Sequence, residues 1–158
     1  MPPTIYTIGH GRAGFAEVAA VLEQHGVATI IDVRSQPFSG HAPEFSRREL
    51  EVLAAVAGIG YRWMGDALGG RPDDPALLRA DGEPDYEAIH RSPRFQAALV
   101  DLAAIAAEAG VALLCAEERP EHCHRALLIA PALQGMGWRV VHLLHDGTAL
   151  AHQPPLAM

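Results

Sequence analysis

The chain has 158 residues, the usual length of one domain, and 49% of them are apolar, which is enough for a full hydrophobic core without disulfide bonds or a structural metal. The net charge of −7 argues against broad electrostatic binding to nucleic acid, and no apolar run reaches the ~20 residues that span a membrane. Because residues 1–4 lack the features of a signal peptide, we expect a cytoplasmic protein whose two cysteines are thiols.

Apolar runs alternate along the chain with amphipathic segments, which predicts alternating strands and helices. The expected strands cover residues 4–8, 27–33, 58–63, 111–115 and 138–144. The expected helices cover residues 15–25, 46–57, 85–91, 94–109 and 122–134. This alternation predicts an α/β fold with three layers, in which a mostly parallel sheet of about five strands carries helices on both faces.

Three further features concern the boundaries of these elements. Ser46, followed by Glu49 three residues later, predicts a capping box at the start of the second helix. Residues 67–84 are irregular and long enough to form a functional loop or a lid. We expect residues 1–148 to form a single domain and residues 149–158 to form a frayed C-terminal tail.

Polar side chains follow several of the expected strands. His10 follows the first strand, Asp32 and Arg34 close the second, and Cys115 and Glu117 close the fourth. The carboxyl ends of parallel strands meet at one rim of a sheet, and ligands of such folds bind there. We therefore expect these residues to gather into one site.

Carboxylates at this rim are candidates for general acid and base catalysis, with Glu117 and Asp32 in these roles and His10 orienting the ligand. The alternative for Asp32 is an ion pair with Arg34 or Arg125 that only fixes loops. In the functional interpretation, Arg34 and Arg125 hold an anion beside helix N-termini.

The two cysteines differ in their predicted roles. Cys115 is explained most simply as the end of an apolar strand, whereas Cys123 lies in the first turn of a helix beside His124 and Arg125 and is the better-placed nucleophile. A zinc site is not favoured, because the spacing between the cysteines is not the short pair of structural zinc sites. The sequence predicts no metal and identifies no cofactor.

A set of short motifs in a fixed order resembles the DUF488 family, over almost the whole chain. These motifs are Thr7–His10, Asp32–Ser35 with Pro37 and Ser39, Phe45, Gly58-Ile59 with Tyr61, Leu68–Gly70, Leu114–Glu117 and Cys123–Arg125. The family is functionally uncharacterised, so the resemblance implies a Rossmann-like fold and a pocket but no reaction. The ligand-binding residues that it implies in addition to the two arginines are Ser35, Ser39, Gly69, Gly70, Cys115 and His124.

Together these features predict an enzyme, a hydrolase or a transferase, that acts on a small anionic ligand such as a nucleotide-derived molecule. One alternative is a non-catalytic module that binds a nucleotide or another metabolite, with the loop over residues 66–85 closing on it. Another is a metal- or thiol-dependent protein. Asp32–Arg34 before Gly40-His41 is similar to the opening of a rhodanese domain, but Cys115 and Arg125 are too far apart for a compact rhodanese loop.

Overall fold

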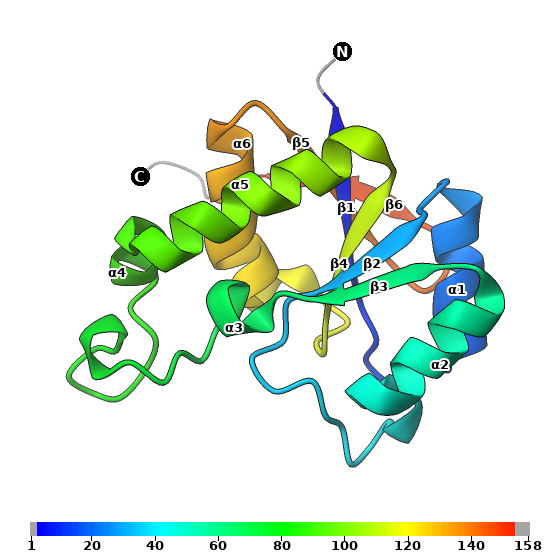
Figure 1. The fold of residues 1–158 in the computed structure, drawn as a ribbon, viewed down its shortest axis with the longest axis horizontal. Coiled ribbons are helices and arrows are strands. Elements are labelled where there is room, and N and C mark those ends of the chain that lie inside the picture. The colour runs from blue at the N-terminus through cyan, green and yellow to red at the C-terminus, as the bar shows by residue number, and fades with distance from the viewer. Residues whose placement is uncertain (1–2, 154–158) are drawn as a thin grey trace.

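The computed structural model describes residues 3–153, without the side chain of His122. Its strands are β1 (Thr4–Gly9), β2 (Thr29–Asp32), β3 (Gly60–Trp63), β4 (Val111–Cys115), β5 (Arg139–Leu143) and β6 (Ala149–Ala151). They form one sheet in the order β3-β2-β4-β1-β5-β6, in which only β6 runs antiparallel to its neighbour. The predicted α/β fold with a mostly parallel sheet is confirmed (Figure 1).

Helices cover both faces of this sheet. Their bounds are α1 (Phe15–Gln24), α2 (Arg47–Ala57), α3 (Gly65–Leu68), α4 (Tyr86–Arg91), α5 (Pro93–Glu108) and α6 (Ala130–Gly135). The apolar side chains of α1 and α2 belong to one core cluster, and those of α3–α6 belong to a second. Figure 1 shows α1 and α2 to the right of the sheet, with α4 and α6 to its left. The three-layer arrangement follows from these two cores.

The sequence of β4 explains why it lies inside the sheet. All five of its residues are buried, with β2 on one side and β1 on the other. Side chains alternate across a strand, so Leu113 and Cys115 face the core below α5 and α6, while Ala112 and Leu114 face the core below α1 and α2. A strand that is covered on both faces needs such a continuous apolar run.

The parallel strands end at a common rim, as the alternation of strands and helices predicted. The loops that follow β1, β2 and β4 lie together at the lower edge of the sheet in Figure 1. Hydrogen bonds join them there, since the amides of His10 and Gly11 donate to the carbonyls of Cys115 and Ala116. The amide of Val33 likewise donates to the carbonyl of Leu114.

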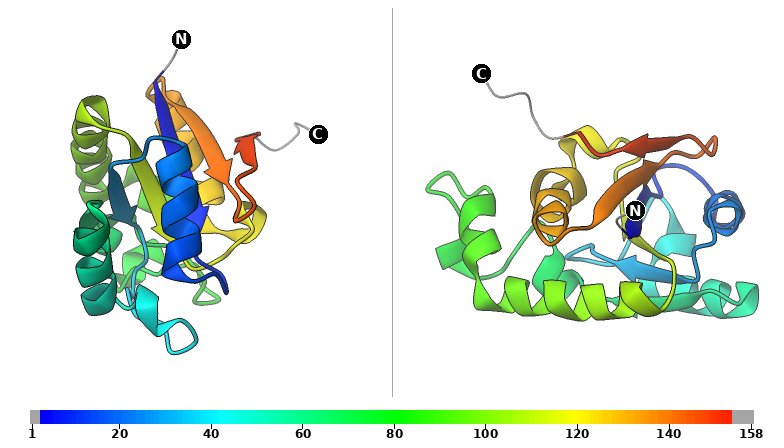
Figure 2. Two further views of the ribbon diagram at one scale, coloured as in Figure 1. Left: turned by 90° about the vertical axis from the view of Figure 1, so that its right-hand side faces the viewer. Right: turned by 90° about the horizontal axis from the view of Figure 1, so that it is seen from above.

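The structure corrects the expectation of a frayed tail, because residues 149–151 form β6. This strand pairs with β5 at the edge of the sheet, as both views in Figure 2 show. The Asp146-Gly147 turn directs the chain back, with Asp146 Oδ1 accepting from the Thr148 amide and Gly147 at a φ of 88°. The rest of the expected tail, residues 154–158, lies outside the described part of the chain.

Two predicted helix starts also differ from the structure. Ser46 precedes α2, but its hydroxyl does not cap the helix; it accepts from the Ser39 amide and donates to the Ser39 carbonyl instead. The expected helix over residues 122–134 is divided into a short turn at Pro120–His122, a π-helical turn at Arg125–Ile129 and α6.

Within residues 3–153, no helix combines the length and the apolar character needed to cross a membrane.

Candidate functional site

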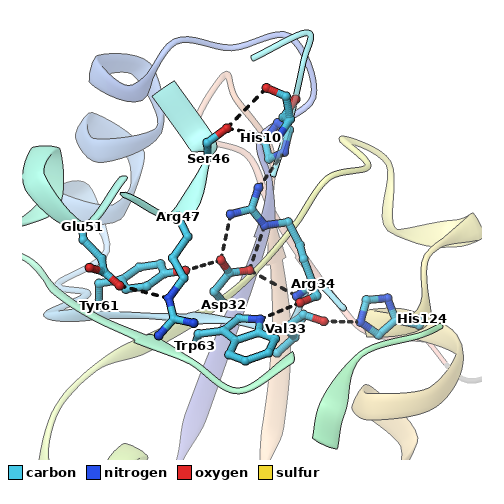
Figure 3. A network of polar contacts seen from close by, with 11 residues as sticks. His10, Asp32, Val33, Arg34, Ser46, Arg47, Glu51, Tyr61, Trp63 and His124 are labelled. Atoms are coloured by element: carbon cyan, nitrogen blue, oxygen red, sulfur yellow. Dashed lines mark hydrogen bonds and ion pairs between the residues drawn. The ribbon is translucent and has the colours of Figure 1, made fainter. Parts of the chain in front are cut away.

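Asp32 and Arg34 form a buried ion pair at the end of β2 (Figure 3). Arg34 Nε donates to Oδ1 of Asp32 at 2.8 Å, and Arg34 Nη2 donates to Oδ2 at 2.7 Å. The Arg34 amide also donates to Oδ1, and the Tyr61 hydroxyl donates to Oδ2 at 2.5 Å. Each carboxylate oxygen therefore has two donors, so the geometry suits Asp32 for holding Arg34 in place.

Residues of β3 complete this network from the neighbouring strand. Trp63 Nε1 donates to the carbonyl of Arg34 at 2.8 Å, and the guanidinium of Arg47 lies over the Trp63 ring at 4.9 Å from its centre. Burial, together with the hydrogen bond to Asp32, raises the pKa of Tyr61, which keeps its hydroxyl protonated. Trp63 was not foreseen as part of the site, because the register that pairs it with Asp32 is not readable from the sequence.

His10, after β1, contacts the same network. Its ring is buried and stacks on Phe45, with centroids 4.6 Å apart and an angle of 12° between the planes. Nδ1 lies 3.1 Å from the Gly11 carbonyl, and Nε2 lies 3.5 Å from Arg34 Nη1. Burial lowers the pKa of His10, which favours the neutral ring: Nδ1–H donates to Gly11 and Nε2 accepts from Arg34. His10 thus fixes the third side of the Arg34 guanidinium.

Arg125 is fully buried and holds the loop between β4 and the π-helical turn. Its Nη1 donates to the Glu117 carbonyl at 2.6 Å and to the sulfur of Cys115, and its Nη2 donates to the Glu118 carbonyl at 2.9 Å. Gly9 lies directly against this contact, where a Cβ would overlap the Glu117 carbonyl and Arg125 Nη1. A glycine is therefore required at the end of β1, and the two buried arginines, Arg34 and Arg125, both have internal partners.

The sulfur of Cys123 lies beside the imidazole ring of His124. His124 Nε2 lies 2.9 Å from the Val33 carbonyl, to which it donates a hydrogen bond (Figure 3). Its Nδ1 therefore faces the Cys123 sulfur, at 3.7 Å. The hydrogen bond with Cys115 is the largest influence on Cys123; together with His124 and the Arg125 amide it outweighs burial and lowers the pKa of Cys123 to about 4. A lowered pKa favours the thiolate, which is the nucleophilic form of cysteine.

An open cleft of about 420 Å³ lies in front of this pair. Seven of the residues predicted from the sequence line it: Arg34, Ser35, Gly70, Cys115, Glu117, Cys123 and His124. Five others do not, namely His10, Asp32, Ser39, Gly69 and Arg125. His10 and Asp32 contact the lining residue Arg34, and Arg125 contacts the lining residues Cys115 and Glu117. Ser39 instead accepts a hydrogen bond from the Ala42 amide, and Gly69 packs against Ser35.

Several lining residues were not singled out from the sequence. They are Gln36, Phe38, Arg71, Glu83, Pro84, Tyr86 and Ala116. Three of them, Arg71, Glu83 and Pro84, belong to the long irregular segment after α3, which was predicted to be a functional loop or a lid without naming these residues as ligand-binding. The length of that segment was the available signal, and its contacts with the rim depend on the fold.

A family model described as "Domain of unknown function DUF488" matches residues 15–131, most of the chain. The chain belongs to the DUF488 family. The resemblance seen in the motifs is thereby confirmed. The DUF488 match includes Asp32, Arg34, Cys115 and the Cys123-His124 pair, but it does not reach β1 or His10. No curated protein and no solved structure matches the chain.

Metal ions in proteins are held by His, Cys, Asp and Glu side chains that converge on one point. Among the side chains described within residues 3–153, no three His, Cys, Asp or Glu residues are arranged to hold a metal ion. Cys115, Cys123 and His124 lie together, but the sulfurs contact each other and the imidazole donates to Val33. These three residues are therefore in contact with one another and with the backbone of Val33.

Proposed function

We propose that this DUF488 chain is a thiol-dependent hydrolase or transferase that acts on a small anionic ligand in the cleft. The observation that carries the proposal is the alignment of Cys123, His124 and the Val33 carbonyl at the cleft wall. Cysteine enzymes use this arrangement, in which a nucleophile contacts a base and a third group orients the base. In this protein, the backbone carbonyl of Val33 is the third group, because it accepts a hydrogen bond from His124.

The chemistry that suits this arrangement is acyl transfer through a covalent intermediate. The Cys123 thiolate attacks the carbonyl carbon of the substrate, a carbon–sulfur bond forms, and the bond to the leaving group breaks. His124, whose Nδ1 takes the Cys123 proton when the thiolate forms, gives that proton to the leaving group. Water or a second acceptor then attacks the thioester carbon, and the carbon–sulfur bond breaks to release the acyl product and the Cys123 thiolate. The proton of the attacking group passes to Glu117, an exposed carboxylate on the cleft wall.

The preference for an anion rests on Arg71. This residue is exposed, lines the cleft and makes no ion pair within residues 3–153, whereas the guanidinium of Arg34 is bound to Asp32 and that of Arg125 to backbone carbonyls. An arginine without an internal carboxylate partner can bind a carboxylate or phosphate of the ligand with two parallel hydrogen bonds. We assign the anion to Arg71 rather than to the two buried arginines.

Aromatic side chains on the same cleft favour a ligand with a planar group. Phe38 is 75% exposed, and Tyr86 is half-buried, and both line the cleft. Exposed aromatic rings stack on planar ligand groups, and the polar side chains of the same cleft can bind the polar parts of such a ligand. A nucleotide-derived molecule combines such a ring with an anion, and it is the ligand class that we propose.

The test uses two activated esters, mono-4-nitrophenyl succinate, which is anionic, and 4-nitrophenyl acetate, which is neutral. We expect nitrophenolate release from both, an acyl adduct on Cys123 in intact-protein mass spectra, and a preference for the anionic ester. Cys123→Ser should abolish release, and Arg71→Gln should remove the preference while retaining hydrolysis of the acetate. Release by Cys123→Ser at the wild-type rate would overturn the proposal.

A matched pair of carboxylate variants tests the second step. Glu117→Gln should accumulate the acyl adduct, because proton transfer from water is slowed after acylation has occurred. Glu83→Gln removes a charge from the same cleft and serves as the control. Equal accumulation in both variants would assign the effect to the charge of the cleft and not to Glu117.

A further inference from the structure

The sulfur atoms of Cys115 and Cys123 lie 2.8 Å apart, although the residues are eight positions apart in the chain. One ends β4 and the other precedes the π-helical turn, and both are reduced and buried at the wall of the cleft. A disulfide bond is about 2.05 Å long, so the two sulfurs need to approach by only about 0.8 Å to form one. The two sulfurs are therefore already in contact while both residues are free thiols.

The loop between them is held in this shape by Arg125. Its two terminal nitrogens donate to the carbonyls of Glu117 and Glu118, which lie within the eight-residue separation, and one of them also donates to Cys115. The β4 end is fixed as well, because the His10 amide donates to the Cys115 carbonyl. The approach of the two sulfurs is therefore built into the fold and does not depend on a mobile loop.

The buried guanidinium of Arg125 requires a nearby negative charge to offset the cost of removing it from water. It is fully buried, makes no ion pair with a carboxylate within the described residues, and has no hydrogen-bond partner for Nε. A buried cation without a compensating anion is strongly destabilising. The hydrogen-bonded thiol pair can supply the anion if it keeps one proton between its two sulfurs, because the negative charge on Cys123 then lies one hydrogen bond away from the Cys115 sulfur that Arg125 contacts.

The two thiols are not equivalent in this pair. Burial raises the pKa of Cys115, whereas the hydrogen bond with Cys115 and the nearby His124 lower the pKa of Cys123. Cys123 is therefore the attacking thiolate and Cys115 keeps its proton. This division of roles matches a dithiol in which one cysteine attacks and the other resolves the product.

We propose that Cys115 is a resolving cysteine and that Cys115 and Cys123 cycle between a dithiol and a disulfide by exchange with low-molecular-weight disulfides. The proposal adds a redox reaction to the proposed thiol-dependent activity. The regulation described next rests on that proposed activity. A Cys123 bound in the disulfide has no thiolate, so it cannot attack an acyl substrate. Oxidation would then switch the site off reversibly.

The exchange has two steps, and atoms and electrons balance in each. First, the Cys123 thiolate attacks one sulfur of the small disulfide, a mixed disulfide forms, and one small thiolate leaves. Second, Cys115 loses its proton to the solvent and attacks the Cys123 sulfur, the internal disulfide forms, and the second small thiolate leaves. The protein, which begins with one thiolate and one thiol, has then lost two electrons and the Cys115 proton, and the small disulfide has become two thiolates that take up protons from the solvent. Excess small thiol reverses both steps.

The test equilibrates the full chain in mixtures of reduced and oxidised glutathione, followed by acid quenching, alkylation of free thiols and intact-protein mass spectrometry. We expect the wild type to lose both alkylatable thiols together, without a stable glutathione adduct, and a peptide map to show Cys115 linked to Cys123. Cys115→Ser and Cys115→Ala should instead accumulate a glutathione adduct on Cys123. Cys123→Ser should remain unmodified, because the Cys115 thiol is buried with a raised pKa.

Two outcomes would overturn the proposal: a stable adduct on Cys123 in the wild type at the level seen in Cys115→Ser, or no Cys115–Cys123 peptide under oxidising conditions. The peptide map is made on the wild type, so it stands even if a variant fails to fold. The failure of the proposed function is seen separately in the ester assay. Loss of ester turnover on oxidation and its return with excess glutathione would connect the two.

Discussion

Asp32 and Arg34 are joined by two parallel hydrogen bonds inside the protein, and the carboxylate also accepts from Tyr61 (Figure 3). Replacing Asp32 by Asn removes the negative charge and leaves a buried guanidinium without its anion. We expect Asp32→Asn to reduce the free energy of unfolding by about 3–5 kcal/mol, as breaking a buried ion pair does. Urea denaturation followed by circular dichroism measures the change.

The control for this prediction is an ion pair on the surface. Arg47 and Glu51 pair at 3.0 Å with both side chains about half exposed, and pairs of this kind contribute at most about 1 kcal/mol. Glu51→Gln should therefore shift the denaturation midpoint only slightly. If Asp32→Asn behaved like Glu51→Gln, the pair would not be the anchor that its geometry indicates.

The second prediction concerns the pH dependence of thiol alkylation. Because the pKa of Cys123 is lowered, its thiolate is already formed well below neutral pH, and the rate of alkylation by iodoacetamide should be nearly constant between about pH 5 and 8. His124→Gln removes one of the groups that stabilise the thiolate, so the inflection should move upward. Mass spectrometry of the Cys123 peptide measures the rate. A wild-type rate that rises steadily through this range would contradict the prediction.

Gly70 provides a test of how His124 is positioned. A Cβ at residue 70 would lie 2.8 Å from Cγ and 2.9 Å from Cβ of His124, too close to be accommodated without moving the imidazole. We expect Gly70→Ala to slow alkylation of Cys123 and to reduce stability by about 1–3 kcal/mol, the usual cost of overpacking. Gly40→Ala is the matched control, since a Cβ there meets no atom within 4 Å. Equal effects of the two substitutions would show that the contact with His124 is unimportant.

His142 gives a prediction for stability against pH. Thr7 Oγ1 lies 2.6 Å from its Nδ1, and burial lowers its pKa to about 4 from 6.5. The unfolded chain therefore binds the proton at higher pH than the folded chain does. Stability is at its full value above about pH 6.5 and falls as the pH drops toward 4, by at most about 3 kcal/mol.

The measurement compares variants across that range of pH. His142→Gln should flatten the dependence of the denaturation midpoint between pH 6.5 and 4. His41→Gln, at an exposed position, should keep the wild-type dependence. A variant of His142 with an unchanged pH profile would mean that other groups cause the loss of stability.

The fold was largely predictable because its signals are local. The continuous apolar run of β4 and the glycines that end α1 and α2 fix the alternation of strands and helices, and parallel pairing follows from it. The strand β6 escaped prediction because it has only three residues, all exposed, and lacks any periodicity. The Asp146-Gly147 pair, a common hairpin turn, was the signal that could have indicated it.

The site was less predictable, because the partners of its charged groups come from distant parts of the chain. The sequence placed Asp32, Arg34 and Arg125 at the rim, but whether each binds a ligand or an internal group depends on the register of β2 with β3 and on the path of the loop after β4. The same holds for Cys115 and Cys123, whose contact across eight residues results from the π-helical turn and the buried arginine. The sequence therefore identified the residues of the site but not the groups with which each of them forms hydrogen bonds.

The family match covers residues 15–131, and yet β1 lies in the middle of the sheet, between β4 and β5. A fragment trimmed to the matched residues would lose both β1 and β5, so one side of β4 would present bare amide and carbonyl groups. Exposed strand edges pair with other chains. We expect such a fragment to elute as large aggregates in size-exclusion chromatography, and work on the isolated matched region would then describe a misassembled protein and not this site.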